Sequence, residues 1–508
     1  MIARRVAIGS ASNFIGKTIA LATWFLLTPF ILGKLGPVSY GIWVLVGSLG
    51  AYGYLLDLGV AGAVVKYTAE FRARGEWDEA HALVATALRA YLVLGAAVVV
   101  LAAGAAIVAP VVLNIPEAEH EATSWTIVLV GLSIGVSLAF MPAPSILRGL
   151  QRYDLYNLVV TTGTLLTAGT TVAVLAAGGG LVGMVAVNVP VTLLMQLVSV
   201  ALVHRIAPEL RFGWHGGGRR QLRLITRFSG AAFAMDVSAN LQTKTDELVI
   251  AAFLPVAAVT PYALARRLSE ISLLLTDQFI KVLMPLASEL DAARDRVRLR
   301  AVYVLSLRLT LAVLMPLSLV LIVFAQPILV AWVGEAYAGG APLVVILAVA
   351  GLFRGIGWPA GALLQGMARH RPIAVLSIIS GLANVGLSIV LIQRIGVVGV
   401  AYGTLIPTAL EAMVILPYGL RVMGIGFAAG LRQALLPPLL PVIPTGLVLL
   451  GMRAWLQPTG IDFLVPAVIG VAVYAGVYAL LGSTRPERDI VRSLAREAFH
   501  RLRGSDAG

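Results

Sequence analysis

The sequence predicts an all-α, polytopic membrane protein with about 14 transmembrane helices. Of its 508 residues, 59% are hydrophobic and only 12% are charged, and the mean hydropathy is +0.91. A soluble protein carries about 25% charged residues. Apolar runs long enough to cross a bilayer as helices recur along the whole chain. A bilayer admits only helices or closed barrels, and these runs are too long and too continuous for barrel strands.

The chain begins with the basic stretch MIARR, and the apolar region that follows continues to Leu32. Because no convincing small-residue cleavage site follows it, we interpret this region as a retained first membrane helix. Four prolines near 437–444 predict a kinked or irregular thirteenth segment. The predicted segments lie near 7–32, 40–65, 88–113, 125–147, 154–177, 181–204, 227–253, 259–287, 301–325, 341–364, 372–393, 397–420, 433–452 and 462–482.

The charges of the connections alternate along the chain. Most of the 38 Lys and Arg residues lie at the two ends and in every second connection, including 205–227, whereas the connection 111–124 carries glutamates and no Lys or Arg. Cytoplasmic loops of membrane proteins are enriched in Lys and Arg. We therefore expect the protein in the cytoplasmic membrane, with both termini in the cytoplasm. The net charge of +13 is then explained by topology, and we expect no nucleic-acid partner.

Composition and motifs also exclude several kinds of site. The chain has no cysteine, its six histidines are scattered, and we expect neither a metal nor a cofactor. No P-loop, HExxH, dinucleotide-binding glycine pattern or Ser/His/Asp arrangement is present. The loops are too short for an extramembranous catalytic domain, so we expect the protein not to be an enzyme.

An internal repeat divides the chain into two six-helix units of the same orientation. Residues of the same type recur in corresponding segments at a spacing of 217 in three pairs and 222 in a fourth: Pro110 and Pro327, Gly149 and Gly366, Pro190 and Pro407, Tyr40 and Tyr262. We therefore predict an N-lobe at 1–204, a basic linker at 205–226, a C-lobe at 227–420, helices 13 and 14 at 421–482, and a basic tail at 483–508. Substrate sites of transporters built in this way lie between the repeats. The tail fits either a helix lying on anionic lipid or a solvated segment.

The seventh and eighth segments carry many charges for membrane helices. A charge at such a depth costs about 2.5–3.5 kcal/mol on insertion scales and faces protein or water. Two interpretations remain: ion pairs such as Arg266–Glu270 that lock helices together, or the lining of a polar cavity, which we favour. One helical face carries Asp236, Asn240, Lys244 and Glu247, and the next carries Arg266, Glu270, Asp277 and Lys281.

Other polar residues also fall inside apolar segments. Asp57 is a lone acid, and Lys17, one turn after Asn13, is its expected partner, either in a structural bridge or in a titratable, ion-binding pair. Arg354 and Trp358 share one face of the tenth segment, and an arginine suits bidentate binding of phosphate. We expect Arg308, in the ninth segment, to reach the cytoplasmic interface by extending its side chain.

Four stretches resemble one family. They are LGKLGPVSYGIWVLVGSLGAYGYLLDLGV at Leu32–Val60, KYTAEFRARGE at Lys66–Glu76, ILRGLQRYDLYN at Ile146–Asn157 and TDELVIAAFLPVAAVTPYALARRL at Thr245–Leu268. They resemble the bacterial polysaccharide transporters, the lipid-linked oligosaccharide (O-antigen type) flippases of the multidrug/oligosaccharidyl-lipid/polysaccharide superfamily. The chain departs from the family at Thr260 and Pro261, where Val-Gly is usual.

The resemblance implies a two-lobe fold like that of multidrug (MATE) transporters, and alternating-access export of undecaprenyl-diphosphate-linked glycans across the cytoplasmic membrane. It implies an ion gradient of protons or sodium as the energy source, and membrane lipids and the polysaccharide polymerase and chain-length machinery as partners. By charge and depth we assign diphosphate and glycan binding to Lys17, Lys244, Arg266, Arg354, Asn13, Asn240 and Trp358, and ion coupling to Asp57, Asp277, Asp236 and Glu270.

Three other functions compete with this one. A multidrug/cation antiporter of the same superfamily is supported by Asp57 but disfavoured by the intramembrane cations. A flippase for the peptidoglycan lipid precursor fits the count of 14 segments. A membrane enzyme such as a glycan polymerase or ligase is disfavoured by the short outer loops.

Overall fold

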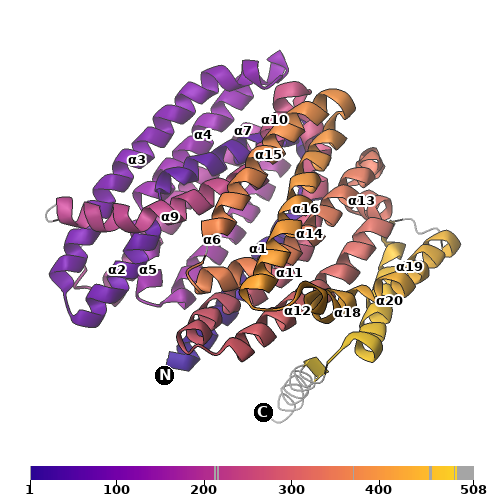
Figure 1. Cartoon of the computed structure of the whole chain (residues 1–508). Helices are drawn as coiled ribbons and strands as arrows, with labels where there is room; N and C mark the ends of the chain where they lie inside the picture. Colours follow the sequence, from indigo (N-terminus) through magenta and orange to yellow (C-terminus); the bar gives the residue numbers. More distant parts are fainter. Residues whose placement is uncertain are drawn as a thin grey trace, which may run out of the picture. The chain divides into compact units, whose positions relative to one another are not determined.

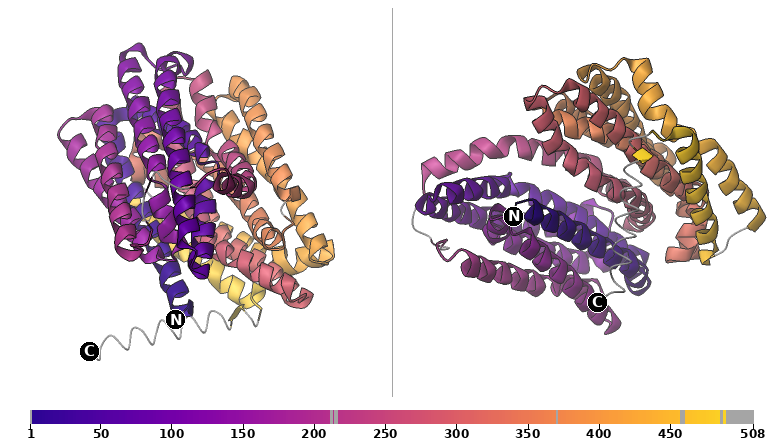
Figure 2. Two further views of the ribbon diagram at one scale, coloured as in Figure 1. Left: turned by 90° about the vertical axis from the view of Figure 1, so that its left-hand side faces the viewer. Right: turned by 90° about the horizontal axis from the view of Figure 1, so that it is seen from below.

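The computed structural model describes residues 2–210, 213, 217–369, 371–456, 460–484 and 487–488, without the side chains of 2–14 and of several residues in α9 and α11. The described residues contain helices and no strands (Figures 1 and 2). The chain divides into two compact units, which we describe separately. The first unit comprises residues 1–263 and 385–400, and the second comprises 264–384 and 401–508.

The first unit contains the helices α1 to α10. They are α1 (Ile2–Gly53), α2 (Val60–Arg74), α3 (Trp77–Val112), α4 (His120–Ala139), α5 (Pro142–Gly149), α6 (Tyr153–Ala176), α7 (Gly180–Ala186), α8 (Asn188–Ile206), α9 (Arg219–Thr243) and α10 (Thr245–Phe253), with the short turns η1 (Tyr54–Asp57), η2 (Glu117–Glu119) and η3 (Val256–Ala258). The core packs Leu83 and Tyr91 of α3 against Leu138 of α4, Ile146 of α5 and Val203 of α8.

The second unit contains most of α11 (Val259–Ala292), α15 (Arg371–Ile395) and α16 (Val397–Val422) and all of the remaining helices. These are α12 (Arg296–Val323), α13 (Ala325–Val333), α14 (Ala341–Gly366), α17 (Phe427–Gly430), α18 (Leu436–Leu439), α19 (Val442–Leu456) and α20 (Leu464–Val477), with the turns η4 (Glu335–Gly340), η5 (Leu431–Leu435), η6 (Gly460–Phe463) and η7 (Tyr478–Gly482). Its core joins Tyr303 and Leu307 of α12 to Leu363, Leu420 and Tyr474. The proline-rich thirteenth segment, predicted near 433–452, is irregular as its prolines predict: it runs through the end of η5, α18 and most of α19.

A kink divides α1 into the first two predicted segments. Gly36 has φ 73° and ψ 174°, a conformation that glycine adopts without steric cost, and Pro37 follows it. Eleven helices of the described residues are long and apolar enough to cross a membrane, and the first of these candidates, Ile15–Asp57, covers both halves of the kinked helix. The charged helices α9 to α11 are not among the candidates. The count of 14 membrane helices therefore stays a prediction.

Backbone turns recur at the spacing of the internal repeat. Gly75 and Arg294, 219 residues apart, have φ 72° and 56°. Each turn makes the same three backbone hydrogen bonds. In the first turn they are Gly75 N to Arg72 O, Glu76 N to Phe71 O and Trp77 N to Gly75 O. In the second turn they are Arg294 N to Asp291 O, Asp295 N to Leu290 O and Arg296 N to Arg294 O.

A second pair of turns, at Gln151 and Ala368, repeats with φ 59° and 56° at a spacing of 217. Gly149 and Gly366 lie two residues earlier, and a Cβ at either would collide with a backbone carbonyl, that of Val65 or of Met284. The repeated residues thus mark equivalent close contacts in the two units, which supports the repeat. The boundaries of the predicted lobes stay a prediction.

Candidate functional site

A polar cluster lies in the first unit where one helix is interrupted. Lys244, with φ −122°, ends α9 and precedes α10, and its N–H donates to Asn240 O at 2.8 Å. A helix end leaves backbone groups to be satisfied by other partners. We call Asn240, Lys244, Thr245, Asp246 and Glu247 the α9–α10 cluster.

The two acids of the α9–α10 cluster are buried. Asp246 is 2% exposed and Glu247 is 0% exposed. The hydroxyl of Tyr262, itself fully buried, donates to Asp246 Oδ2 at 2.5 Å. Both acids lie in the first turn of α10, where the positive end of the helix dipole favours negative charge. A buried carboxylate needs such partners, because desolvation opposes its charged form.

Polar contacts join the α9–α10 cluster to the second half of α1. The oxygens of Tyr52 and Thr245 are 2.5 Å apart, and Asn240 Nδ2 donates to Ala51 O at 3.4 Å. The backbone of η3 also approaches α1: a Cβ on Gly41 would lie 2.5 Å from the carbonyl oxygen of Val256. The second half of α1 is therefore held against the interrupted helix by side chains and by close backbone contact.

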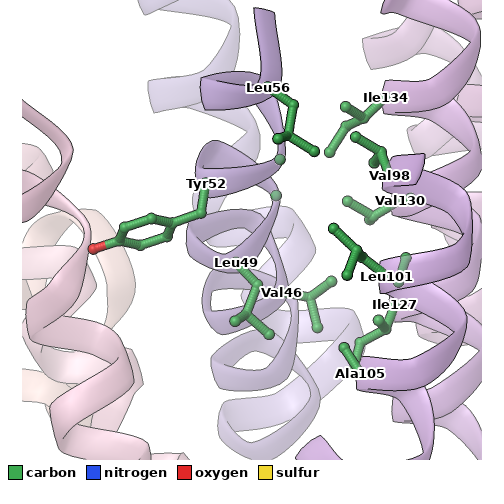
Figure 3. Close-up of a pocket in the computed structure, with 14 residues that line it drawn as sticks. Val46, Leu49, Tyr52, Leu56, Val98, Leu101, Ala105, Ile127, Val130 and Ile134 are labelled. Carbon is green, nitrogen blue, oxygen red and sulfur yellow. The ribbon is translucent and has the colours of Figure 1, made fainter. Parts of the chain in front are cut away.

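The opposite side of α1 borders an apolar cavity. It has a volume of about 300 Å³ and is lined by residues of α1, α3 and α4, including Val46, Leu49, Val98 and Ile134. Figure 3 shows the Tyr52 ring pointing away from the apolar side chains of α3 and α4. The same turn of α1 thus separates an apolar space from the polar cluster.

Asp57 is the last residue of the short helix η1, at the junction between α1 and α2, and does not lie in the middle of one continuous membrane helix as we expected. Leu58 (φ 51°) and Gly59 (φ 77°) are left-handed and interrupt the chain between α1 and α2. The Asp57 carboxylate accepts a hydrogen bond from the N–H of Ala61 at 3.1 Å and one from the hydroxyl of Tyr91. Lys17, which we expected as its partner, lies half-buried on α1, and its pairing with Asp57 stays a prediction.

In the second unit, the predicted pair on α11 is confirmed. Arg266 Nη1 lies 3.3 Å from Glu270 Oε1, and both side chains are partly exposed. Arg354 and Trp358 lie half-buried on α14. The side chains of Asn13, Asp236, Asp277 and Lys281, to which we assigned roles or pairing, lie outside the described residues.

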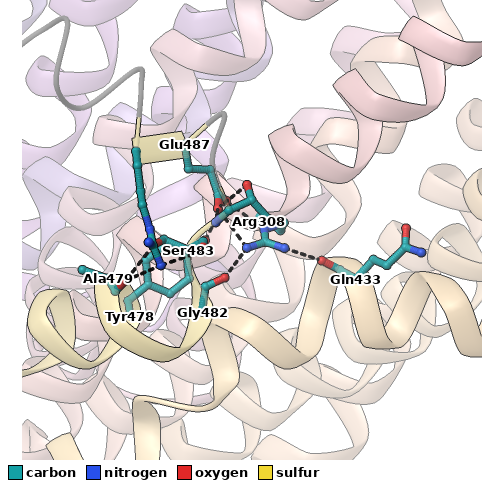
Figure 4. Close-up of polar contacts among 9 residues, drawn as sticks. Arg308, Gln433, Tyr478, Ala479, Gly482, Ser483 and Glu487 are labelled. Atoms are coloured by element: carbon teal, nitrogen blue, oxygen red, sulfur yellow. Dashed lines mark hydrogen bonds and ion pairs between the residues drawn. The ribbon is translucent and has the colours of Figure 1, made fainter.

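The sequence reading was wrong about Arg308. Its side chain, expected at the interface, is only 7% exposed and forms an ion pair with Glu487, which is 3% exposed, at 2.8 Å. Arg308 also donates to Gln433 O at 2.9 Å and to Gly482 O, and the Tyr478 hydroxyl donates to Glu487 at 2.8 Å (Figure 4). Burial disfavours the charged form of Glu487, but hydrogen bonds from Thr484, Arg308 and Tyr478 together hold its pKa below the usual range.

Two further features were missed. Tyr52 and Tyr262 were not assigned to the site, although both contact the α9–α10 cluster. Asp246 and Glu247 were noted as charges without a role, and their burial is a property of the fold. The available signal was the polar run TKTDE inside an apolar hairpin. In the second unit, Glu411 of α16 accepts a hydrogen bond from the Ser377 hydroxyl of α15 at 2.6 Å.

The sequence profile of a family described as "Polysaccharide biosynthesis protein" matches residues 35–342, more than half of the chain. The chain belongs to this family. The match includes the second half of α1 after its kink, the α9–α10 cluster and the turns of the first repeat. No curated protein matches the chain.

Solved structures show the same fold at low sequence identity. The lipid II flippase MurJ, in an inward closed conformation, is 15% identical with a TM-score of 0.71, over 96% of this chain and 100% of that chain. An inward-facing MATE multidrug resistance transporter is 15% identical with a TM-score of 0.63, over 81% of this chain and 94% of that chain. A transporter of the same superfamily from Pyrococcus furiosus is 15% identical with a TM-score of 0.53, over 83% and 94%. This member of the polysaccharide biosynthesis family is thus a multi-pass membrane protein with a transporter fold.

Proposed function

We propose that the protein is a flippase that moves an undecaprenyl-diphosphate-linked oligosaccharide from the cytoplasmic to the outer leaflet of the cytoplasmic membrane. It acts by alternating access of the lobes 1–204 and 227–420, is driven by a proton or sodium gradient, and has both termini in the cytoplasm. It supplies polysaccharide biosynthesis and works beside the polymerase and chain-length machinery. Family membership and a transporter fold support this function.

One structural observation carries the proposal: an interrupted helix that carries a cation at its break and two buried acids directly after it. Interrupted membrane helices place charged side chains and unsatisfied backbone groups where substrates and coupling ions bind in transporters. A lipid diphosphate needs cationic partners, and a glycan needs polar ones. In the α9–α10 cluster, Lys244 supplies a cation for the diphosphate and Asn240 supplies a polar side chain for the glycan.

The remaining residues extend the same roles. Lys17, Arg266 and Arg354 bind the diphosphate together with Lys244, and Asn13 and Trp358 bind the glycan together with Asn240. Asp57, Asp236, Glu270 and Asp277 couple transport to the ion gradient. The hydrogen bond from Tyr91 to Asp57, which sits at a junction between two helices, gives this acid a partner that could exchange when the junction moves.

A flipping assay in proteoliposomes with a defined lipid-linked oligosaccharide tests the proposal. Lys17→Ala, Lys244→Ala, Arg266→Ala and Arg354→Ala should each slow flipping, because a charged hydrogen bond contributes about 1.5–3 kcal/mol, or about tenfold to a hundredfold in rate. Exposed Lys34, outside the proposed site, provides the control Lys34→Ala, which should flip at the parental rate. Unchanged flipping in all four variants would remove these assignments.

Ion coupling needs a separate measurement. Asp57→Asn and Asp277→Asn should each abolish the pH or sodium dependence of transport in vesicles. Retained dependence in both variants would rule out coupling through these acids.

A flippase for the peptidoglycan lipid precursor is the second candidate. One observation favours it: the likeness to the lipid II flippase covers 100% of that chain and 96% of this one, whereas the likeness to the MATE transporter covers 81% of this one. Complementation of a strain depleted of its peptidoglycan precursor flippase tests it. Growth would favour this substrate, and failure to grow together with glycan flipping in proteoliposomes would favour the first.

A further inference from the structure

A second hollow in the first unit lies apart from the α9–α10 cluster and from the cavity of Figure 3. It has a volume of about 680 Å³ and lies between the η1–α2 junction, α3 and α9. Its walls include Leu58, Val93, Leu222 and Phe233, and its polar side chains include Thr86 and Arg89. We call it the α3–α9 groove.

The α3–α9 groove exposes apolar side chains along its opening. Val93 is 69% exposed, Leu222 46% and Leu58 38%. In a protein that spans a bilayer, such exposure is favourable where the side chains meet lipid chains and not water. The volume falls within the range of about 300–1,000 Å³ typical of small-molecule sites.

The start of α9 is fixed on α3 by specific contacts. Arg220 Nη1 lies 2.7 Å from Glu79 Oε1, and Gln221 Nε2 donates to Glu79 Oε2 at 3.2 Å. Gly217 has φ 73°, and a Cβ there would collide with Thr86 and with the carbonyl of Ala82. The wall of the groove formed by α9 is therefore held at its beginning by an ion pair and by close backbone contact.

The side of α9 that lines the groove follows helical spacing. Leu222, Ile225, Thr226 and Phe233 lie at intervals of three, one and seven residues, which puts them on one stripe. From Leu222 to Phe233 the helix rises about 16 Å at 1.5 Å per residue. One leaflet of hydrocarbon is about 15 Å thick, half of the full core. The groove wall is thus as long as a single lipid chain.

Cationic side chains accompany this apolar wall. Arg89 lines the groove and is exposed, and its Nε donates to Ala85 O at 3.2 Å. The first turns of α9 add exposed Arg219 and Arg223. A guanidinium suits a phosphate oxygen pair, and basic pockets between membrane helices at the cytoplasmic side bind anionic lipid headgroups. The charge and shape together match a molecule with an anionic head and an apolar chain.

We propose that the α3–α9 groove binds an anionic phospholipid of the bilayer, with its phosphate at Arg89 and an acyl chain along Leu222, Ile225 and Phe233. The bound lipid joins α9 to α3 and the η1–α2 junction and so stabilises the first unit. This role goes beyond the proposed transport function and does not depend on which substrate the protein moves.

Purified full-length protein in neutral detergent tests the proposal with two probes, phosphatidylglycerol and phosphatidylcholine of the same chains. Phosphatidylglycerol should raise the thermal unfolding temperature and phosphatidylcholine should raise it less. Arg89→Gln should weaken the apparent affinity for phosphatidylglycerol about fivefold, since one basic residue contributes about that much to binding anionic lipid. Val93→Trp, at an exposed position, should block the groove and remove the shift.

Arg298→Gln is the matched control, because Arg298 is an exposed arginine on α12 of the second unit. It should respond to phosphatidylglycerol as the parent does. Equal shifts with the two lipids, or unchanged affinity in both Arg89→Gln and Val93→Trp, would overturn the proposal. It would also be overturned if undecaprenyl diphosphate displaced phosphatidylglycerol at much lower concentration, because the groove would then belong to a polyprenyl lipid.

Discussion

The ion pair between Arg308 and Glu487 should make a large contribution to the stability of the second unit. Arg308 donates Nε and Nη2 to the two carboxylate oxygens of Glu487 at 2.8 and 2.9 Å, so the pair is bidentate and both side chains are buried. The same guanidinium reaches the carbonyl oxygens of Gln433 and Gly482 (Figure 4). One side chain of α12 therefore satisfies groups from η5, from η7 and from the chain after η7.

Among the described residues, Glu487→Ala would leave the buried Arg308 charge with the carbonyl oxygens of Gln433 and Gly482 as its acceptors. Breaking a buried pair on one side costs about 3–5 kcal/mol, because the remaining charge is desolvated without its counterion. Arg308→Met leaves the Glu487 carboxylate in the same position, with Thr484 and Tyr478 as donors, and should cost a similar amount. The double variant Arg308→Met with Glu487→Met buries neither charge and should be more stable than either single variant.

Reversible unfolding of the detergent-solubilised protein would give the three free energies of unfolding and the coupling energy between the two positions. Arg488→Gln is the control in the same segment, since Arg488 is exposed and its side chain bonds only to Ser483 and Ala479 among the described contacts. It should change the free energy by less than about 0.5 kcal/mol. Additive losses in the double variant, or a Glu487→Ala cost no larger than that of Arg488→Gln, would refute the reasoning.

Three further predictions follow from the described contacts. Because the pKa of Glu487 is lowered in the folded state, its contribution to stability is complete above its unfolded pKa of about 4.3 and is lost as pH falls through the folded value, so parental stability should fall at acid pH more than that of Glu487→Gln. Gly41→Ala should destabilise by about 1–3 kcal/mol because its Cβ meets a carbonyl of η3, whereas Gly47→Ala, with open space around it, should be neutral or stabilising in unfolding assays. Tyr262→Phe should cost about 1–3 kcal/mol in the same assay, since buried Asp246 loses a donor, and a neutral result would show that other donors suffice.

Much of the fold follows from local sequence properties. Hydropathy predicts the helices, and the repeat spacing relates their turns, because a helix or a turn depends mainly on residues that are close in sequence. The turns at Gly75 and Arg294 share a left-handed backbone although one is a glycine and the other is not, so spacing was the more general signal. The pair Arg266–Glu270 was predictable for the same reason, since it lies within one helix.

Contacts between distant segments were not predictable in this way. Arg308 and Glu487 are 179 positions apart, and hydropathy places the arginine near a helix end without showing what packs beside it. The turn directly after Asp57 was not predicted, because nothing in the apolar run indicates that Leu58 adopts φ 51°. Its donors come from later elements, Ala61 from α2 and Tyr91 from α3, so neither contact can be read from the apolar run itself.

The interruption at Lys244 explains how charged residues of the seventh predicted segment can be buried in the folded protein. The break begins a new helix at Thr245, so Asp246 and Glu247 occupy the first turn of α10, where the helix dipole and the Tyr262 hydroxyl favour their negative charge. A continuous helix would place the same acids in mid-helix, without that stabilisation. The interruption therefore allows the unit to bury two acids next in sequence to Lys244 and Thr245.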